Sequence, residues 1–77
     1  MDVRDFVFQT VAEAFGKDVA EIAGDTRFIE DLGASSVNYF PVINALEDEY
    51  DLDIQYQEFR RECPTVADAV AYVEEQI

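Results

Sequence analysis

The sequence predicts an all-α domain, a small four-helix bundle made of three main helices and one short helix. Apolar residues recur at spacings of three and four in three separate segments, which is the pattern of a helix with one buried face. Apolar residues also make up 49% of the 77 residues, enough for one compact core in a chain of this size. We therefore expect residues 1–77 to form a single domain.

The first helix is predicted over residues 3–15, and Gly16 can end it. Its apolar face holds Val3, Phe6, Val7, Val11 and Phe15. Residues 17–35 then form a long, partly ordered loop, and a loop of that length in a small domain is usually functional. Its expected apolar anchors are Ile22, Phe28, Ile29 and Leu32.

The second helix is predicted from about Ser36 to Tyr50, and a short helical turn over residues 56–61 carries Phe59 inwards. In the last helix, Thr65 can cap the N-terminus, and the Asp68 side chain three residues later can accept the backbone N–H of Thr65. The apolar face of the second helix holds Val37, Phe40, Ile43, Leu46 and Tyr50, and that of the last helix holds Val66, Val70, Val73 and Ile77.

Pro41 conflicts with a regular second helix. At the sixth position it cannot donate to the carbonyl of Val37, a defect of about 3 kcal/mol in a helix interior. Either the helix is distorted there, or Asn38 is the true cap and Pro41 falls in the tolerant first turn. A distorted first turn is the favoured interpretation.

The charge balance excludes several classes of partner. Eighteen acidic and five basic residues give a formal net charge of -13, which repels nucleic acid and anionic membranes and steers the chain towards basic protein surfaces. No apolar run approaches the length of a transmembrane helix, and the N-terminus lacks the pattern of a signal peptide. A single cysteine fits a reducing compartment. We expect a cytoplasmic monomer.

The same composition argues against catalysis by the chain itself. A nucleophilic serine needs a base beside it, and the sequence contains no histidine. The carboxylates are too scattered to indicate a catalytic pair or a metal site, and we expect no bound metal. Cys63 also lacks a histidine partner and is interpreted as a passive thiol.

Two adjacent serines precede the second helix and have different expected roles. Ser35 is placed to cap the helix, which leaves Ser36 as the first helical residue with its hydroxyl free. An anion attached there would meet the positive end of the helix dipole and unpaired backbone N–H groups. The alternative is that both serines only cap the helix.

Three blocks of sequence together resemble the acyl carrier proteins, and the match spans essentially the whole chain. They are Phe28-Ile29-Glu30-Asp31-Leu32-Gly33-Ala34-Ser35-Ser36-Val37, Ala45-Leu46-Glu47-Asp48-Glu49-Tyr50 and Thr65-Val66-Ala67-Asp68-Ala69-Val70. The resemblance implies a four-helix bundle that carries 4′-phosphopantetheine on Ser36, donated from coenzyme A by a phosphopantetheinyl transferase. The thiol of that arm would carry acyl groups to enzymes with basic docking patches.

The resemblance also implies two sets of contact residues. Partner recognition is expected at Asp31, Val37, Asn38, Glu47 and Asp48, and the lining of an acyl cleft at Phe40, Ile43, Leu46, Ile54 and Phe59. The motif departs from the usual family pattern, because Ser35 stands where an aspartate is common and Val37 where a leucine is common. Asn38 and Pro41 also stand where acids are common, which favours a specialised pathway with a dedicated loading enzyme over ordinary fatty-acid synthesis.

Two other functions remain open from the sequence. One is a peptidyl or polyketide carrier with the same architecture, loaded with an amino acid or a ketide unit. The other is an unmodified acidic helical module that only binds a protein partner. The first differs in the enzyme that loads the arm, and the second predicts no covalent change on Ser36.

Overall fold

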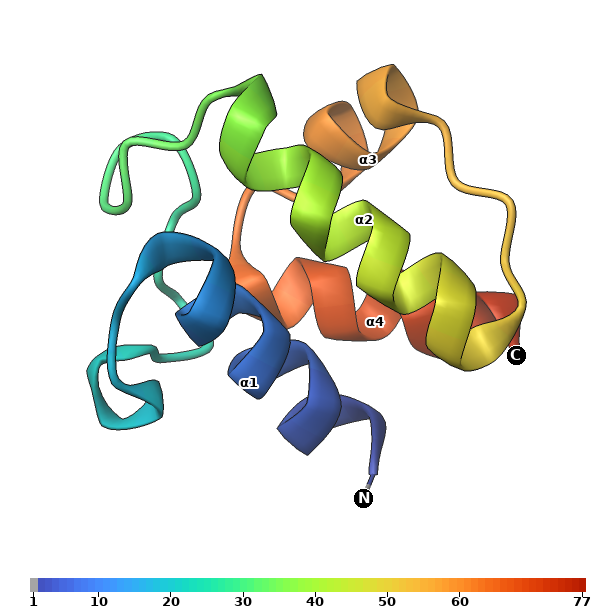
Figure 1. Cartoon of the computed structure of the whole chain (residues 1–77), viewed down its shortest axis with the longest axis horizontal. Coiled ribbons are helices and arrows are strands. Elements are labelled where there is room, and N and C mark those ends of the chain that lie inside the picture. Colours follow the sequence, from blue (N-terminus) through green and yellow to red (C-terminus); the bar gives the residue numbers. More distant parts are fainter. Residues whose placement is uncertain (1) are drawn as a thin grey trace.

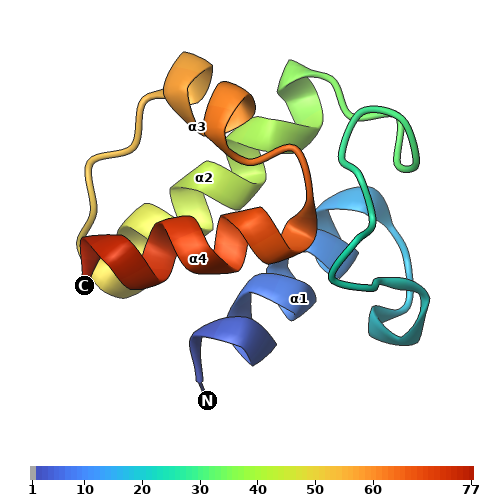
Figure 2. The ribbon, with the colours of Figure 1, turned by 180° about the vertical axis from the view of Figure 1, so that it is seen from behind.

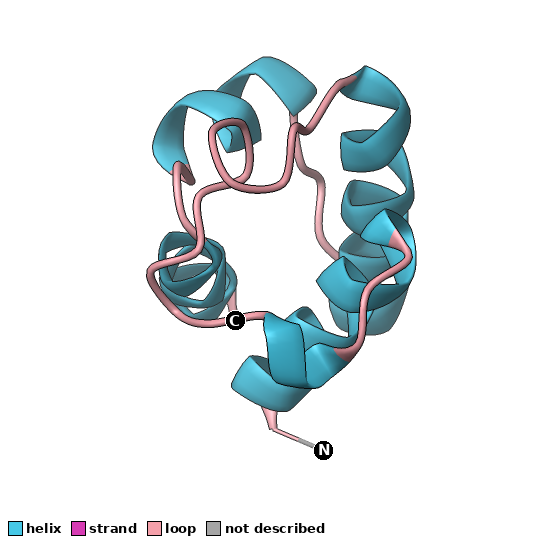
Figure 3. Cartoon of the chain, turned by 90° about the vertical axis from the view of Figure 1, so that its left-hand side faces the viewer, coloured by secondary structure: helices cyan, strands magenta, loops and turns pink. Residues whose placement is uncertain are grey.

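The computed structural model describes residues 2–77, and within that range it is helical with no strand (Figures 1 and 3). The predicted all-α bundle of three longer helices and one short helix is confirmed. A short 3₁₀ helix, η1, was not predicted. The elements are α1 (Val3–Phe15), η1 (Val19–Glu21), α2 (Ser36–Tyr50), α3 (Tyr56–Glu62) and α4 (Val66–Gln76).

Local interactions fix the ends of α1 and α4. Asp2 caps α1 by accepting the Asp5 N–H at 2.8 Å, and Gly16 ends it in the left-handed conformation with φ of 65°. In α4 the predicted capping box is present: the Asp68 N–H donates to Thr65 Oγ1 at 3.2 Å, and the Thr65 N–H donates to Asp68 Oδ2 at 3.2 Å. These bonds satisfy N–H groups that have no partner within the helix.

Four helices enclose one core. α1 packs against α2 and α4, and α3 packs against the same two helices. Seen from behind, α4 runs between α3 and α1 (Figure 2). Aromatic rings fill the centre, with the Phe28 and Tyr39 ring centroids 5.6 Å apart and the Tyr39 and Phe59 centroids 6.2 Å apart. Phe59 therefore points inwards, as predicted.

The long connection between α1 and α2 is tied to the start of α4. The Phe28 N–H donates to the Pro64 carbonyl at 3.1 Å, and the Val66 N–H donates to the Thr26 carbonyl at 3.0 Å. Ile22 and Phe28 are buried and Leu32 packs against the core, as predicted. The prediction for Ile29 was wrong, because its side chain is exposed.

The predicted buried face of α2 is confirmed at Ile43 and Leu46, and Tyr50 packs against the core, but the prediction was wrong for the first turns of the helix. Tyr39 is only 1% exposed, whereas its neighbour Phe40 is 47% exposed and Val37 is 73% exposed. The buried residues are Tyr39, Val42, Ile43 and Leu46, which also follow helical spacing. The sequence contains two overlapping apolar stripes, and packing against Phe28 and Phe59 selects the one that includes Tyr39.

The predictions for the other helices hold with one exception. In α1, Val7 and Val11 are fully buried, and the remaining predicted residues pack against the core. In α4, Val66, Val70 and Val73 are buried, but Ile77 is exposed because it lies beyond the end of the helix at Gln76.

Candidate functional site

The connection into α2 folds into a closed turn that delivers Ser35 in an extended conformation. The Leu32 N–H donates to the Arg27 carbonyl at 3.1 Å, and the Ala34 N–H donates to the Phe28 carbonyl at 2.9 Å. Gly33 has φ of 64°, a left-handed conformation that a residue with a Cβ adopts only at a cost. Ser35 then has φ of -126° and ψ of 179°, the extended backbone typical of an N-cap.

Ser35 and Asn38 together form the cap of α2. Ser35 is the N-cap residue, as predicted, in a reciprocal capping-box arrangement with Asn38. Asn38 Oδ1 accepts the Ser35 N–H at 3.1 Å and the Ser35 hydroxyl at 3.3 Å. Asn38 is therefore the third helical residue, and the alternative in which Asn38 itself is the N-cap was wrong. An amide can accept these bonds as the glutamate of a usual capping box does.

Ser36 is the first residue of α2, and its side chain is exposed. Among the described residues its hydroxyl makes no hydrogen bond, because the cap is made by Ser35 and Asn38. The Ser35 carbonyl accepts the N–H groups of Asn38 and Tyr39, while those of Ser36 and Val37 have no helical partner. An anionic phosphodiester on Ser36 would fit this helix N-terminus.

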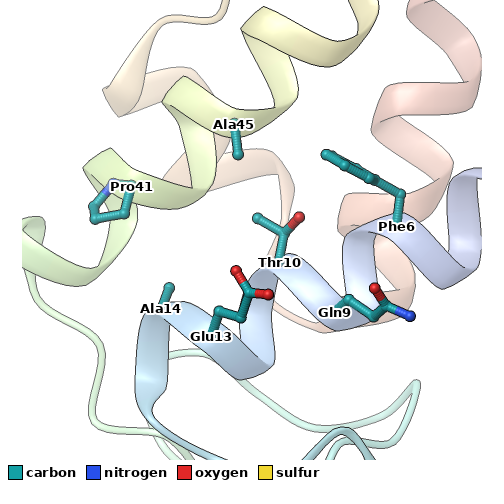
Figure 4. Close-up of a pocket in the computed structure, with 7 residues that line it drawn as sticks. All are labelled: Phe6, Gln9, Thr10, Glu13, Ala14, Pro41 and Ala45. Carbon is teal, nitrogen blue, oxygen red and sulfur yellow. The ribbon is translucent and has the colours of Figure 1, made fainter.

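Pro41 lies inside α2, which continues from Ser36 to Tyr50. A distortion caused by Pro41 stays a prediction, because 3₁₀ bonding is frequent at helix N-termini. The Ser35 carbonyl accepts both the Asn38 N–H, at 2.9 Å, and the Tyr39 N–H, at 3.1 Å, so the first turn combines 3₁₀ and α bonding. The proline ring is exposed on the side of α2 that faces α1 (Figure 4).

A cavity of about 430 Å³ lies between α1 and α2. Figure 4 shows its lining residues: Phe6, Gln9, Thr10, Glu13, Ala14, Pro41 and Ala45. None of the five residues predicted to line an acyl cleft is among them. Four of those five are buried in the core, namely Ile43, Leu46, Ile54 and Phe59, while Phe40 is half exposed. Their role as a cleft lining stays a prediction.

Asp31 and Asn38, two of the five predicted partner-recognition residues, make contacts that fix the fold. Asp31 Oδ2 accepts the Arg27 N–H at 2.8 Å, and this bond, with help from the Arg27 guanidinium, lowers the pKa of the Asp31 carboxyl. Arg27 also pairs with Glu30. Asn38 is committed to the helix cap, as described above. Both residues therefore have local structural roles besides any contact with a partner.

The other three predicted partner residues differ in accessibility. Glu47 is half buried, and its carboxylate accepts the Ile54 N–H at 2.9 Å. Val37 and Asp48 are exposed. Only these last two present side chains that the described contacts leave open to a partner.

Sequence reasoning did not predict the contact of Phe40 on α2 with Tyr56 and Arg60 on α3. The Phe40 and Tyr56 ring centroids are 5.1 Å apart, and Arg60 Nη1 donates to the Tyr56 hydroxyl at 3.4 Å. The spacing of four residues between Ser36 and Phe40, and between Tyr56 and Arg60, could have indicated these neighbours. The contact between α2 and α3 could not be read from spacing.

Cys63 is a buried free thiol. Burial, with the nearby acids Asp68 and Glu62, raises the pKa of the Cys63 thiol to about 12, so it is protonated at neutral pH. Its interpretation as passive agrees with this environment. Within residues 2–77 no cluster of metal-ligating side chains has the geometry to hold an ion. No helix in the described range is long and apolar enough to cross a membrane.

Comparison with known proteins assigns the class of this domain. Residues 5–73 match the family model for a phosphopantetheine attachment site. The chain is 41% identical over 76 residues to an acyl carrier protein of Streptococcus pneumoniae, covering 99% of this chain and 97% of the relative. It is also 41% identical to acyl carrier proteins of Exiguobacterium, over 92% of this chain and 89% of the relative, and of Rickettsia typhi, over 96% and 85%.

The chain belongs to the acyl carrier protein family. It is a carrier and not an enzyme, and the cofactor of its domain is 4′-phosphopantetheine. The family assignment, the cofactor and the absence of catalysis were all predicted from the sequence. Interaction with a phosphopantetheinyl transferase and with acyl-transfer enzymes follows from the same assignment.

Proposed function

We propose that Ser36 is the attachment residue and that the chain shuttles thioester-bound acyl groups between enzymes. The observation that supports Ser36 is its position as the exposed first residue of α2, directly after a cap that uses Ser35. The neighbouring hydroxyl is engaged by Asn38, so the two serines are not equivalent. When attached, the arm supplies a thiol that forms thioesters with acyl groups.

The chain contributes the nucleophile and the transferase contributes the base. A bond forms between Ser36 Oγ and the phosphorus on the pantetheine side of coenzyme A, and the pyrophosphate bond breaks so that adenosine bisphosphate leaves. The hydroxyl proton passes to a base of the transferase, because the chain has no histidine. The dipole of α2 then stabilises the phosphodiester.

We further propose that a dedicated loading enzyme supplies the acyl group. No charged residue occurs between Asp31 and Glu47, so the first half of α2 offers no carboxylate to a basic docking patch. Asp48 and its acidic neighbours would steer such enzymes from the far half of the helix, with contacts that weaken in salt. Loading at an undiminished rate by an acyltransferase of general fatty-acid synthesis would contradict this proposal.

Intact mass tests the attachment directly. The chain is incubated with coenzyme A and a broad-specificity phosphopantetheinyl transferase, beside Ser36→Ala and the matched variant Ser35→Ala. We expect one arm on the wild type and on Ser35→Ala, and none on Ser36→Ala, with thermal melting showing that all three fold. Loss of the arm only in Ser35→Ala would move the site by one residue. No modification of any form would favour a module that only binds proteins.

A further inference from the structure

Aromatic rings close the contact between α2 and α3 on the side of Ser36. Inside, the centroid of the Tyr39 ring lies 5.7 Å from that of Tyr56 and 6.2 Å from that of Phe59. Outside, the Phe40 and Tyr56 centroids are 5.1 Å apart. Tyr39 and Phe40 follow Ser36 by three and four residues, so they lie on its side of α2, one helical turn away. The direct way from Ser36 into the core is therefore occupied by rings.

The aromatic cluster continues through the core to α4. The Phe59 centroid lies 6.3 Å from that of Phe28 and 5.6 Å from that of Tyr72 on α4. Phe28 and Phe59 are fully buried, and Tyr39 is 1% exposed. The Tyr72 hydroxyl donates to the Glu58 carboxylate at 2.6 Å, which ties α4 to α3. Because protein interiors are close-packed, extra methylene groups could enter here only if side chains and backbone shifted.

The cavity between α1 and α2 does not offer an alternative place for an acyl chain. Ala45, which lines it, follows Ser36 by nine residues, and nine steps of about 100° place the two side chains on opposite sides of α2. Polar side chains of α1 also line the cavity, namely Gln9, Thr10 and Glu13 (Figure 4). An arm on Ser36 would have to pass around the helix to reach a surface that suits hydrocarbon poorly.

We propose that the core of this carrier takes up no acyl chain, so that the cargo stays in solvent on the arm and is a short or polar acyl group. The proposal rests on the proposed function of Ser36 and specifies the class of cargo. A long alkyl chain held outside the core would keep its methylene groups in water, whereas an acetyl-sized, hydroxylated or amino-bearing group has little apolar surface to bury. Phe59 then packs the core and does not line an acyl cleft.

The first test compares acyl groups of increasing length on the wild-type chain. A broad-specificity phosphopantetheinyl transferase loads Ser36 from acetyl-, butyryl- or octanoyl-coenzyme A, and intact mass follows the reaction of each thioester with hydroxylamine. Each rate is divided by the rate for the same acyl group on coenzyme A. We expect this ratio to stay within about twofold from acetyl to octanoyl, because a thioester outside the core is always accessible. The three loaded forms should melt at the same temperature, because no chain binds the folded state.

Two other results have distinct meanings. A ratio that falls by more than about twofold with chain length, or a melting temperature that rises with it, would overturn the proposed class of cargo and leave Ser36 as the attachment residue. Failure of the transferase to modify the wild type would overturn the function proposed for Ser36, and the proposed cargo with it.

A pair of variants tests whether the rings exclude the chain. Phe59→Ala opens space in the core, and the matched variant Phe6→Ala opens space at the cavity between α1 and α2. We expect the octanoyl form of Phe59→Ala to melt higher than its acetyl form, because the chain fills the new space, and the two forms of Phe6→Ala to melt together. Equal melting of the two forms of Phe59→Ala, or stabilisation of Phe6→Ala by octanoyl, would overturn the role given to the aromatic cluster. Phe59→Leu opens less space and replaces Phe59→Ala in the comparison if the alanine variant does not fold.

Discussion

The two halves of α2 differ in charge and in the contacts that they make. From Ser36 to Leu46 the helix carries no charge, and it leaves Val37 and Phe40 exposed beside the attachment residue. From Glu47 onwards it is acidic, and the Glu47 carboxylate closes the following loop by accepting the Ile54 N–H. The first half is therefore suited to contact a partner, whereas the second half fixes the next turn of the chain and repels other acids.

Within the first half, two adjacent aromatic residues lie on opposite sides of the boundary between core and surface. Tyr39 lies at the centre of the aromatic core, with its ring 5.6 Å from that of Phe28, whereas Phe40 lies outside on the Tyr56 ring. Successive residues on a helix point about 100° apart, so one can be core and the next surface. Composition alone therefore does not separate structure from recognition.

The largest expected effect on stability is the difference between alanine variants of the two aromatic residues. Tyr39→Ala removes a fully buried ring and should lower the free energy of unfolding by about 3–5 kcal/mol, enough to unfold much of a small domain. Phe40→Ala, at a half-exposed site, should cost less than about 1 kcal/mol. Urea unfolding followed by circular dichroism measures both, and similar losses for the two variants would contradict the observed orientation of α2.

A smaller effect is expected in the second half of the helix. Glu47→Ala leaves the buried Ile54 without an acceptor for its N–H, which should cost about 1–3 kcal/mol. Asp48→Ala, at the exposed neighbouring position, should change stability by less than about 0.5 kcal/mol. Glu47→Gln retains an oxygen acceptor, so its loss of unfolding free energy should lie between those of the two alanine variants. Equal unfolding midpoints for the two alanine variants would argue that Glu47 is only a surface acid.

Loss of the N-terminal cap of α2 should lower the free energy of unfolding by less than the Glu47 substitution does. Asn38→Ala removes the acceptor of the Ser35 N–H and hydroxyl, and the loss should be about 1 kcal/mol. Asn38→Asp keeps an acceptor and adds a negative charge near the helix N-terminus, so its melting temperature should match or exceed that of the wild type. Thermal melting of both variants measures the contribution of Asn38. An unchanged melting temperature for Asn38→Ala would mean that Ser35 alone caps the helix.

The parts of the fold that could be predicted from sequence are those that local interactions determine. Gly16 ends α1 and the Thr65 and Asp68 pair begins α4, because each depends on residues within one turn. The position of Ser36 followed from the same kind of reasoning. The burial of Ile43 and Leu46 was predicted, but the burial of Tyr39 in place of Phe40 was not, because the two apolar stripes at the start of α2 are distinguished only by packing against Phe28 and Phe59.

The candidate site shows the same limit. The exposure of Ser36 and the N-cap role of Ser35 were predictable from their positions before an apolar run. The partner of Ser35 was not, because an asparagine at the third helical position is an unusual capping acceptor. The contact of Phe40 with Tyr56 depends on how α3 packs against α2, which the sequence does not state.

The smallest expected effect concerns the acids of the second half. The longest dimension of the molecule is 27 Å. The Debye length falls from about 30 Å at 0.01 M to about 10 Å at 0.1 M, so at low salt every carboxylate repels every other, and at higher salt only near neighbours interact. Added NaCl should therefore raise the melting temperature, with a gain in stability below about 1 kcal/mol. KCl at equal ionic strength should do the same.

Variants of the two halves of α2 test the origin of this salt response. The double variant Asp48→Asn with Glu49→Gln should melt higher than the wild type at 0.01 M and respond less to salt. Phe40→Ala should keep the wild-type salt response, because the first half has no charge to screen. A salt response that Phe40→Ala diminished and the double variant did not would reverse the division of α2 into an uncharged recognition half and an acidic half.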